Sequence, residues 1–342
     1  MKPFIIPVFI PNYGCPNQCI YCDQNISIGQ QSLPKSDEVS NIIEAHLKSA
    51  AAHFKYRSYA QVAFYGGTFT GLPFDTQRNY LKTIVPYLKN KKVKSIRLST
   101  RPDYINQQNL DLLKSFSVKT IELGVQSLDD DVLKLSQREY RSQKVEESAR
   151  LIKENGLELG IQLMPGLPGD TEEKIMNTSE QVCKIKPDFL RIYPTLVIKN
   201  TLLEKLYLKR EYTPLSLKQA VSICKRMLLL FQYNHIPVIR MGLQPTKTLL
   251  KPGTIVAGPF HSAFRELVLS SILYDRIYTS IKKHLTSKTF IFSVHPSELS
   301  TFLGNKKENV KKLKEEFPGY DIRFQQDGRI HYGNFQLSNS II

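Results

Sequence analysis

The chain has 342 residues, 41% of them hydrophobic and 23% charged, which is ordinary for a soluble globular protein and enough for a large domain plus a small one. No run approaches the roughly 20 apolar residues of a membrane span, so we expect no segment embedded in a membrane. The formal net charge of +16 favours a polyanionic partner such as nucleic acid, and a lysine-rich surface without such a partner is the alternative.

The first predicted element is a strand at Phe4–Ile10. Lys2 precedes this apolar stretch, as it would in a signal segment or in a lipoprotein processing site ending at Cys15. Prolines at positions 3, 7 and 11 interrupt the stretch and make it a poor signal segment. We therefore expect a cytoplasmic protein.

Three cysteines follow this strand with the spacing C-x3-C-x2-C, at Cys15, Cys19 and Cys22. Three thiolates on one short loop suit an iron–sulfur cluster, whose irons are ligated by cysteine. A four-iron cube would keep one iron without a cysteine, and that iron would be open for chemistry. A structural zinc site normally has four protein ligands, and the next histidine is His46. Zinc or a disulfide remain the structural alternatives.

Strand-like and helix-like segments alternate through the first two-thirds of the chain. The predicted strands after the first are 61–65, 95–99, 120–124, 159–163 and 189–193, and the predicted helices are 36–54, 76–90, 106–116, 142–155, 171–185 and 216–234. About six such units predict an α/β fold, a partial (βα)6 TIM-type barrel, with its site at the carboxyl ends of the strands. A last strand at 236–243 ends this first domain, predicted to span residues 1–245.

Residues 246–342 are predicted to form a small C-terminal α/β domain. A crossing loop at 246–258 and a helix at 262–285 open it, and the strands 289–294, 321–325 and 329–332 alternate with the helices 297–303 and 308–317. The order of elements over 289–332 resembles the core of a KH domain, in which a G-x-x-G turn clamps nucleic-acid backbone. The turn here is Gly304–Lys307, with Lys307 at the position of the second glycine. A small appendage that caps the barrel is the alternative.

The candidate ligand-binding residues follow the second, third and fourth strands; they are Gly66, Gly67, Thr68, Ser99, Arg101, Gln126 and Arg138. Two adjacent glycines let another molecule approach the backbone closely. Gln126 offers donors and an acceptor suited to hydroxyl groups. Arg138, twelve residues behind Gln126, reads by itself as an exposed helix charge. Tyr65, Met164 and Tyr193 are candidates for a substrate pocket or for core packing.

The cysteine loop resembles the cluster-binding loop of the radical S-adenosylmethionine (radical SAM) superfamily. The resemblance implies a 4Fe-4S cluster whose open iron is chelated by the amino and carboxylate groups of SAM. Reduction by a donor such as flavodoxin or ferredoxin then cleaves SAM and yields a 5′-deoxyadenosyl radical. It also implies that Gly66, Gly67 and Thr68 bind the amino group, that Gln126 contacts the ribose and Arg138 the carboxylate, and that Ser99 and Arg101 line the pocket.

Residues 60–245 resemble more narrowly the radical SAM domain of the catalytic subunit of Elongator, which modifies wobble uridine in tRNA. The resemblance rests on the motifs at 99–103, 124–127 and 190–201. The first cysteine gap is shorter here, Arg138-Glu139-Tyr140 replaces an Arg-Gly-His, and we expect no acetyltransferase domain, as in bacterial standalone members. The resemblance implies an RNA substrate, tRNA. The alternatives are a tetrapyrrole-like small-molecule substrate, or an RNA-binding protein with a structural or redox-sensing cluster.

Overall fold

The computed structural model describes residues 3–11, 13–23, 32–50 and 59–340. It contains two compact units. The first consists of Met1–Leu217 and Met227–Phe260, and the second of Lys218–Arg226 and His261–Ile342. None of the helices in the described part of the chain combines the length and the apolar character that crossing a bilayer requires.

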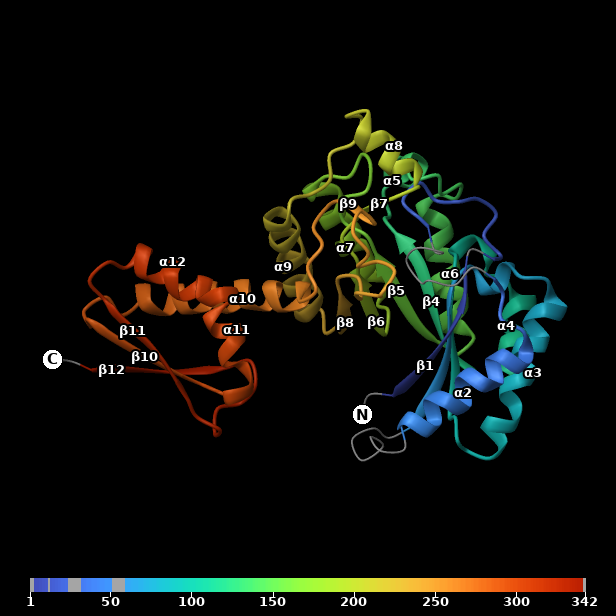
Figure 1. Ribbon diagram of the computed structural model, residues 1–342, viewed down its shortest axis with the longest axis horizontal. Coiled ribbons are helices and arrows are strands. Elements are labelled where there is room, and N and C mark those ends of the chain that lie inside the picture. The colour runs from blue at the N-terminus through green and yellow to red at the C-terminus, as the bar shows by residue number, and fades with distance from the viewer. Residues whose placement is uncertain (1–2, 12, 24–31, 51–58, 341–342) are drawn as a thin grey trace. The chain divides into compact units, whose positions relative to one another are not determined.

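The first unit is built on a sheet of seven strands, all parallel, that follow one another in chain order. They are β1 (Phe4–Ile10), β2 (Ala60–Gly66), β3 (Ser95–Thr100), β4 (Val118–Gln126), β5 (Glu158–Leu163), β6 (Phe189–Ile192) and β8 (Val238–Met241). β1 and β8 are its edges, so the sheet is an open part of a barrel (Figure 1). The predicted α/β partial barrel is confirmed, and its last strand, β8, lies within the strand predicted at 236–243.

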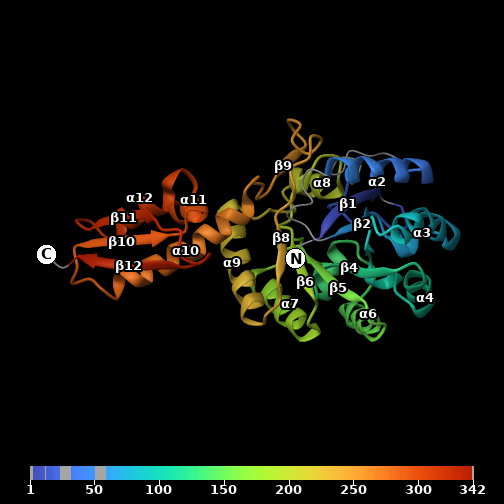
Figure 2. The same cartoon turned by 90° about the horizontal axis from the view of Figure 1, so that it is seen from below.

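Helices connect successive strands of this sheet. They are α2 (Ser36–Ala50), α3 (Phe74–Lys89), α4 (Gln107–Ser115), α6 (Ser142–Glu154), α7 (Glu172–Ile185) and α9 (Leu217–Tyr233). Figure 2 shows α2, α3, α4, α6 and α7 outside the arc of strands. Two short helices, α5 (Asp130–Leu135) and α8 (Leu202–Leu208), were not predicted. Their N-cap residues, Asp129 and Thr201, each accept a backbone hydrogen bond from the first turn, which is a signal visible in the sequence.

The two faces of the sheet differ in chemistry because side chains alternate along each strand. Val62 and Phe64 of β2 are fully buried, and the ring of Phe64 lies 5.7 Å from that of Tyr80 on α3. Gln61 on the opposite face accepts a hydrogen bond of 2.9 Å from Arg97 of β3. The helix-covered face therefore carries the apolar core, and the inner face carries polar and charged side chains.

Two very short strands form a separate antiparallel pair in the first unit, β7 (Val197–Ile198) with β9 (Ile255–Ala257). The crossing loop predicted over 246–258 contains a strand at Ile255–Ala257 that was not predicted. A three-residue strand is too short to show the alternation that identifies strands in a sequence.

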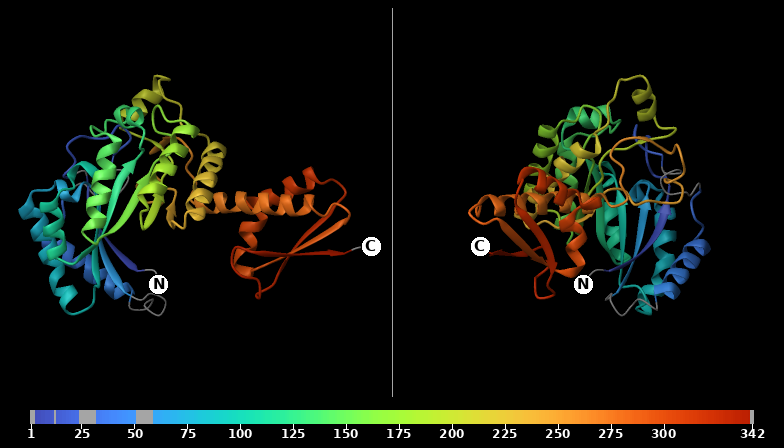
Figure 3. Two further views of the ribbon diagram at one scale, coloured as in Figure 1. Left: turned by 180° about the vertical axis from the view of Figure 1, so that it is seen from behind. Right: turned by 60° about the vertical axis from the view of Figure 1, so that its left-hand side comes forward.

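The second unit holds a three-stranded sheet in the order β11–β10–β12. Its elements are α10 (Phe264–Lys282), β10 (Thr289–Val294), α11 (Leu299–Leu303), α12 (Glu308–Glu316), β11 (Asp321–Gln326) and β12 (Phe335–Ser340). Figure 3 shows its helices on one face of this sheet, around a core that includes Phe290, Phe292 and Phe302. β10 runs parallel to β11 and antiparallel to β12.

The last strand of the second unit lies later than predicted. Residues 329–332 form no strand, and Asp327 instead accepts a hydrogen bond of 2.9 Å from the backbone N–H of Arg329, which closes a turn. β12 starts at Phe335, whose ring packs against Phe292 and Phe302. The domain boundary at residue 245 and the KH-like assignment of 289–332 stay predictions.

Candidate iron–sulfur and cofactor site

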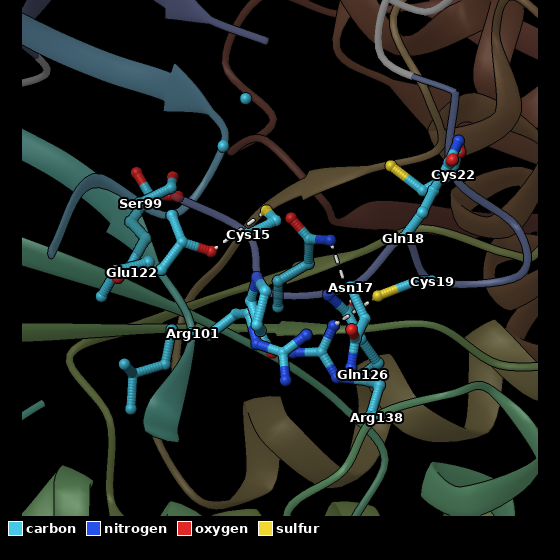
Figure 4. Close-up of a pocket in the computed structure, with 18 of the residues that line it drawn as sticks. Cys15, Asn17, Gln18, Cys19, Cys22, Ser99, Arg101, Glu122, Gln126 and Arg138 are labelled. Atoms are coloured by element: carbon cyan, nitrogen blue, oxygen red, sulfur yellow. Dashed lines mark hydrogen bonds between the residues drawn. The ribbon is translucent and has the colours of Figure 1, made fainter. Parts of the chain in front are cut away.

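A cavity of about 310 Å³ lies where the carboxyl ends of β2, β3 and β4 meet the cysteine loop after β1. All ten residues predicted for the site line it, namely Cys15, Cys19, Cys22, Gly66, Gly67, Thr68, Ser99, Arg101, Gln126 and Arg138. Figure 4 shows the labelled members of this set around one space. Five further residues that line the same cavity were not predicted, namely Asn17, Gln18, Tyr21, Glu122 and Gln162. Glu122 shares a strand face with Gln126, so strand alternation was the signal that could have identified it.

The cysteine loop and the glycine turn after β2 are joined by backbone hydrogen bonds. The Gly67 N–H donates to the Ile10 carbonyl at 2.8 Å, and the Thr68 N–H donates to the Tyr13 carbonyl at 2.9 Å. A Cβ atom on Gly67 would lie 2.1 Å from the Tyr13 carbonyl oxygen. Gly67 is therefore required by the packing of the chain on itself, in addition to the ligand approach that the sequence suggested.

The three thiols are half-buried and lie beside polar groups of the strand ends. Cys15 Sγ lies 3.2 Å from Thr68 Oγ1, and Cys19 Sγ accepts a hydrogen bond of 3.3 Å from Arg138 Nη1. Burial raises the pKa of the Cys15 and Cys22 thiols, so a bound cation is what favours their thiolate forms. Among the described residues, no three His, Cys, Asp or Glu side chains are close enough to share one metal ion. In a cluster each thiolate binds its own iron, so the donor set suits a cluster.

Arg138 is buried, and each of its side-chain nitrogens has a partner within the chain. Nε donates to Tyr140 Oη at 2.7 Å, Nη2 donates to the Gly124 carbonyl, and Nη1 lies 3.3 Å from Cys19 Sγ and 3.2 Å from Tyr21 Oη. Burial raises the pKa of Tyr140 to about 12, so its hydroxyl stays protonated at neutral pH. It donates to the Gly124 carbonyl at 3.1 Å. The reading of Arg138 as an exposed charge is wrong, because its residue is only 4% exposed.

Arg101 is also 4% exposed but is not fully paired. Its Nε and Nη2 donate to the two carboxylate oxygens of Asp103 at 2.9 and 2.8 Å. Its Nη1 is buried and has no hydrogen-bond partner among the described residues. A buried charged donor without an acceptor costs free energy, so this nitrogen marks a place for an anionic group.

Gln126 ends β4 with a left-handed backbone, at a φ of 72°. Few residues other than glycine adopt this region, and the register between β4 and β5 shifts at this point. The Gln126 side-chain oxygen accepts a hydrogen bond of 3.2 Å from Gln162 Nε2, which orients the amide at the cavity wall. Ser99 lines the cavity without an interaction that fixes its role.

A network of polar side chains lies on the inner face of the sheet and extends from the cavity away from the cysteines. We call it the inner-face network; it consists of Tyr65, Arg97, Glu122 and Arg191. Glu122 accepts from Arg97 Nη1 at 2.8 Å and from Tyr65 Oη at 3.1 Å, and its other oxygen lies 2.6 Å from Arg191 Nε. Burial raises the pKa of Tyr65, so its hydroxyl stays a donor. Two guanidinium groups thus share one carboxylate, which leaves an excess of positive charge beside the cavity.

The other pocket candidates lie next to this network. Tyr193 Oη is 3.2 Å from Arg191 Nη1, and the Tyr193 ring packs against the cluster of Val132, Met164 and Leu167. Arg240 of β8 is in register with Arg191, is half-buried, and has no hydrogen bond or ion pair with any described residue. Tyr65 and Tyr193 are therefore hydrogen-bonded to Arg191 of the network and do not line the cavity itself, whereas Met164 belongs to packing.

The fold and the site together define an α/β half-barrel with a candidate three-cysteine iron–sulfur centre at the carboxyl ends of its strands. Residues 9–182 match the Radical SAM superfamily, and residues 187–273 match the Radical_SAM C-terminal domain. The chain belongs to the radical SAM superfamily, whose members use a 4Fe-4S cluster and SAM.

Individual relatives indicate a narrower group within the superfamily. A protein of Dehalococcoides mccartyi named tRNA uridine(34) acetyltransferase is 30% identical over 239 residues, which cover 58% of this chain and 50% of the relative. An uncharacterized protein of Methanocaldococcus jannaschii is 28% identical over 236 residues, covering 65% of this chain and 70% of that protein. The archaeal Elp3 of Methanocaldococcus infernus, solved with an N-terminal deletion, superimposes with a TM-score of 0.61 at 19% identity, covering 82% of this chain and 62% of that one.

These matches confirm the predicted resemblance to the Elongator catalytic subunit. The chain spans half the length of the acetyltransferase. The match therefore does not show that this chain has the whole activity of that protein.

Proposed function

We propose that this protein modifies RNA, with tRNA as the substrate, by radical chemistry. The observation that carries the RNA assignment is the 30% identity to a protein named for acting on uridine 34 of tRNA. The net charge of +16 and the positive excess of the inner-face network agree with an anionic substrate.

The residues of the cavity fit the two cofactors of the family. Cys15, Cys19 and Cys22 would hold the 4Fe-4S cluster. The turn of Gly66, Gly67 and Thr68 would meet the SAM amino group and Gln126 its ribose, while the cavity arginines are the candidates for its carboxylate. When both are bound and the cluster is reduced, by flavodoxin or ferredoxin in this proposal, they supply a radical that removes one hydrogen atom from the substrate.

The chain's own task is to present one nucleotide of the RNA to that radical and to keep water away. Tyr65 and Tyr193 offer aromatic rings on which a base can stack, and Arg240 offers a guanidinium without a partner in the described structure for a phosphate. A base must leave its stack to reach a pocket at strand ends, and the anticodon loop of tRNA is single-stranded, which lowers that cost.

The test compares modified nucleosides in total tRNA from a deletion strain and its parent by liquid chromatography and mass spectrometry. We expect one modified nucleoside to disappear in the deletion strain. Wild-type protein should restore it and Cys19→Ala should not. Cys183→Ala is the matched control, because Cys183 lies on α7 outside the cavity, and it should restore the nucleoside fully.

A second assay tests the radical reaction independently of the identity of the substrate. Anaerobically reconstituted protein, given dithionite and SAM, should form 5′-deoxyadenosine. Formation of 5′-deoxyadenosine with an unchanged tRNA profile would contradict the RNA substrate and favour a small molecule, such as a tetrapyrrole. A cluster-containing protein that forms none would contradict the radical reaction itself.

A further inference from the structure

The two buried arginines of the cavity, Arg101 and Arg138, both lie close to the ring of one aromatic residue, Tyr140. Their guanidinium carbons are 5.4 and 5.0 Å from the centre of the Tyr140 ring. We infer that they have separate tasks: Arg101 binds the carboxylate of SAM, and Arg138 supports the cluster through the sulfur of Cys19. This differs from the role of Arg138 expected from the sequence, and it holds whatever the substrate of the enzyme is.

Arg138 already uses all three of its side-chain nitrogens within the chain. They donate hydrogen bonds to Tyr140, to the Gly124 carbonyl, and to Cys19 and Tyr21, which belong to three different segments, so of its five N–H groups only the second one of Nη2 has no partner among the described residues. A two-point bond to a carboxylate would therefore break at least one of these hydrogen bonds in a buried place. The existing arrangement instead directs Nη1 to a cluster ligand at 3.3 Å.

Arg101 has the opposite arrangement. Asp103 holds two of its nitrogens at 2.9 and 2.8 Å and thereby fixes the guanidinium plane, while the third, Nη1, is buried and unpaired among the described residues. Figure 4 shows Arg101 and Arg138 beside the cysteine loop. A ligand carboxylate at Nη1 would satisfy the donor with a charge-assisted hydrogen bond.

The charges lead to the same assignment. Asp103 pairs with Arg101, and no carboxylate among the described residues forms an ion pair with Arg138, so one positive charge is left over in the cavity wall. Repulsion between two cations held near one ring is offset when each has its own anion. Arg101 would then have Asp103 and the SAM carboxylate, and Arg138 would have the thiolate-ligated cluster.

A donor to a cluster ligand has a measurable effect. Hydrogen bonds to the sulfurs of an iron–sulfur cluster set its reduction potential, because they stabilise the more negative, reduced form. Arg138 should therefore raise the potential of the cluster, and Arg101 should leave it unchanged before SAM binds.

The experiment makes two measurements on each of two variants, using anaerobically reconstituted full-length protein. The first is the dissociation constant, by equilibrium dialysis, of SAM and of decarboxylated SAM. We expect wild type and Arg138→Gln to bind SAM more tightly than decarboxylated SAM. Arg101→Gln should lose this preference, so that the ratio of the two dissociation constants changes by roughly 10- to 100-fold, as for one hydrogen bond to a charged group. The second is the midpoint potential of the cluster without SAM, by electron paramagnetic resonance. It should fall in Arg138→Gln and not in Arg101→Gln.

Arg150→Gln is the control for both measurements, because Arg150 is exposed on α6 and pairs only loosely with Glu154, at 3.6 Å. Iron content and circular dichroism check that each variant folds, and Arg101→Lys and Arg138→Lys replace any glutamine variant that fails to hold iron. The assignment would be overturned if the Arg138 variant lost the preference for SAM over decarboxylated SAM while the Arg101 variant kept it. It would also be overturned if the midpoint potential of the cluster were the same in Arg138→Gln as in wild type. Neither measurement contains RNA, so the outcome is independent of the proposed substrate.

Discussion

Glu122 is the residue on which the inner face of the barrel depends. Its carboxylate lies between Arg97 and Arg191, and the three side chains are only 6 to 14% exposed. Both arginines pack on rings, with the guanidinium carbon of Arg97 4.7 Å from the Phe189 ring centre and that of Arg191 5.3 Å from Tyr65. Without the carboxylate, two buried cations would remain with no counter-charge.

Replacing Glu122 by Gln should therefore lower the free energy of unfolding by about 3 to 5 kcal/mol, the usual cost of removing one partner from a buried ion pair. Denaturant unfolding followed by circular dichroism measures it. Glu154→Gln breaks an exposed pair with Arg150 and should change stability by less than about 0.5 kcal/mol. Equal effects of the two variants would show that the network does not stabilise the fold.

The site residues were predictable to the extent that they follow strands in sequence. The cysteines, the glycine turn and Gln126 follow apolar strands along the chain, and parallel strands bring their carboxyl ends together. Arg138 was found from its position twelve residues after Gln126 and from the family resemblance. The ion network was not predictable, because which charges face inward depends on strand register. The β3–β4 register shifts beside Arg97, for example. The unpaired nitrogen of Arg101 was also not predictable, because it depends on an ion pair with Asp103 that the spacing of the two residues does not reveal.

Among the elements, the turn after β2 is the one that holds the cysteine loop. A Cβ atom at Gly67 would lie 2.1 Å from the Tyr13 carbonyl oxygen and 2.6 Å from that of Ile10, and backbone atoms cannot move aside as a flexible side chain can. The turn and the loop would have to separate to accommodate it.

Gly67→Ala should consequently reduce iron and sulfide bound after reconstitution by several-fold, measured per chain. Gly328→Ala in the second unit is the matched control, because nothing lies within 4 Å of its added Cβ. Full iron content in Gly67→Ala would mean that this close packing does not position the cysteines.

Element prediction succeeded where a pattern was long enough. β1 has a continuous apolar run, and the helices α2, α3, α4, α6, α7 and α9 have helical periods. Their bounds differ from the prediction by a few residues at most, and the predicted helical residues 51–54 lie outside the described residues. β7 and β9 have two and three residues and carry no period. β12 was misplaced because the deciding fact is tertiary: Phe335 and Leu337 pack on the second unit's core, and residues 329–332 do not.

At the scale of the whole molecule, charge is the dominant property, with 47 lysines and arginines against 31 acidic residues. In the second unit, Lys306 and Lys307 lie exposed between α11 and α12 with φ values of 50° and 60°. Two successive non-glycine residues in this region are uncommon. They project from the turn that the sequence relates to nucleic-acid binding.

If this turn binds tRNA, the double variant Lys306→Glu/Lys307→Glu should weaken binding and flatten its dependence on salt, by up to about one unit of log–log slope for each phosphate that is no longer neutralised. Filter binding over a series of potassium chloride concentrations measures both. Lys282→Glu/Lys283→Glu makes the same charge change at the end of α10 in the same unit and should have the smaller effect. Identical effects would assign binding to diffuse charge and not to the turn.

The anchoring of the cysteine loop affects how the enzyme acquires and keeps its metal. Backbone hydrogen bonds tie the loop to the β2 turn, and the Leu203 N–H fastens Ile20 from α8 at 2.8 Å. These hydrogen bonds do not depend on a metal, so they lower the entropic cost of ordering the loop when a cluster is assembled. We therefore expect that protein whose cluster has been destroyed by oxygen can be reloaded with iron and sulfide without a cycle of unfolding and refolding.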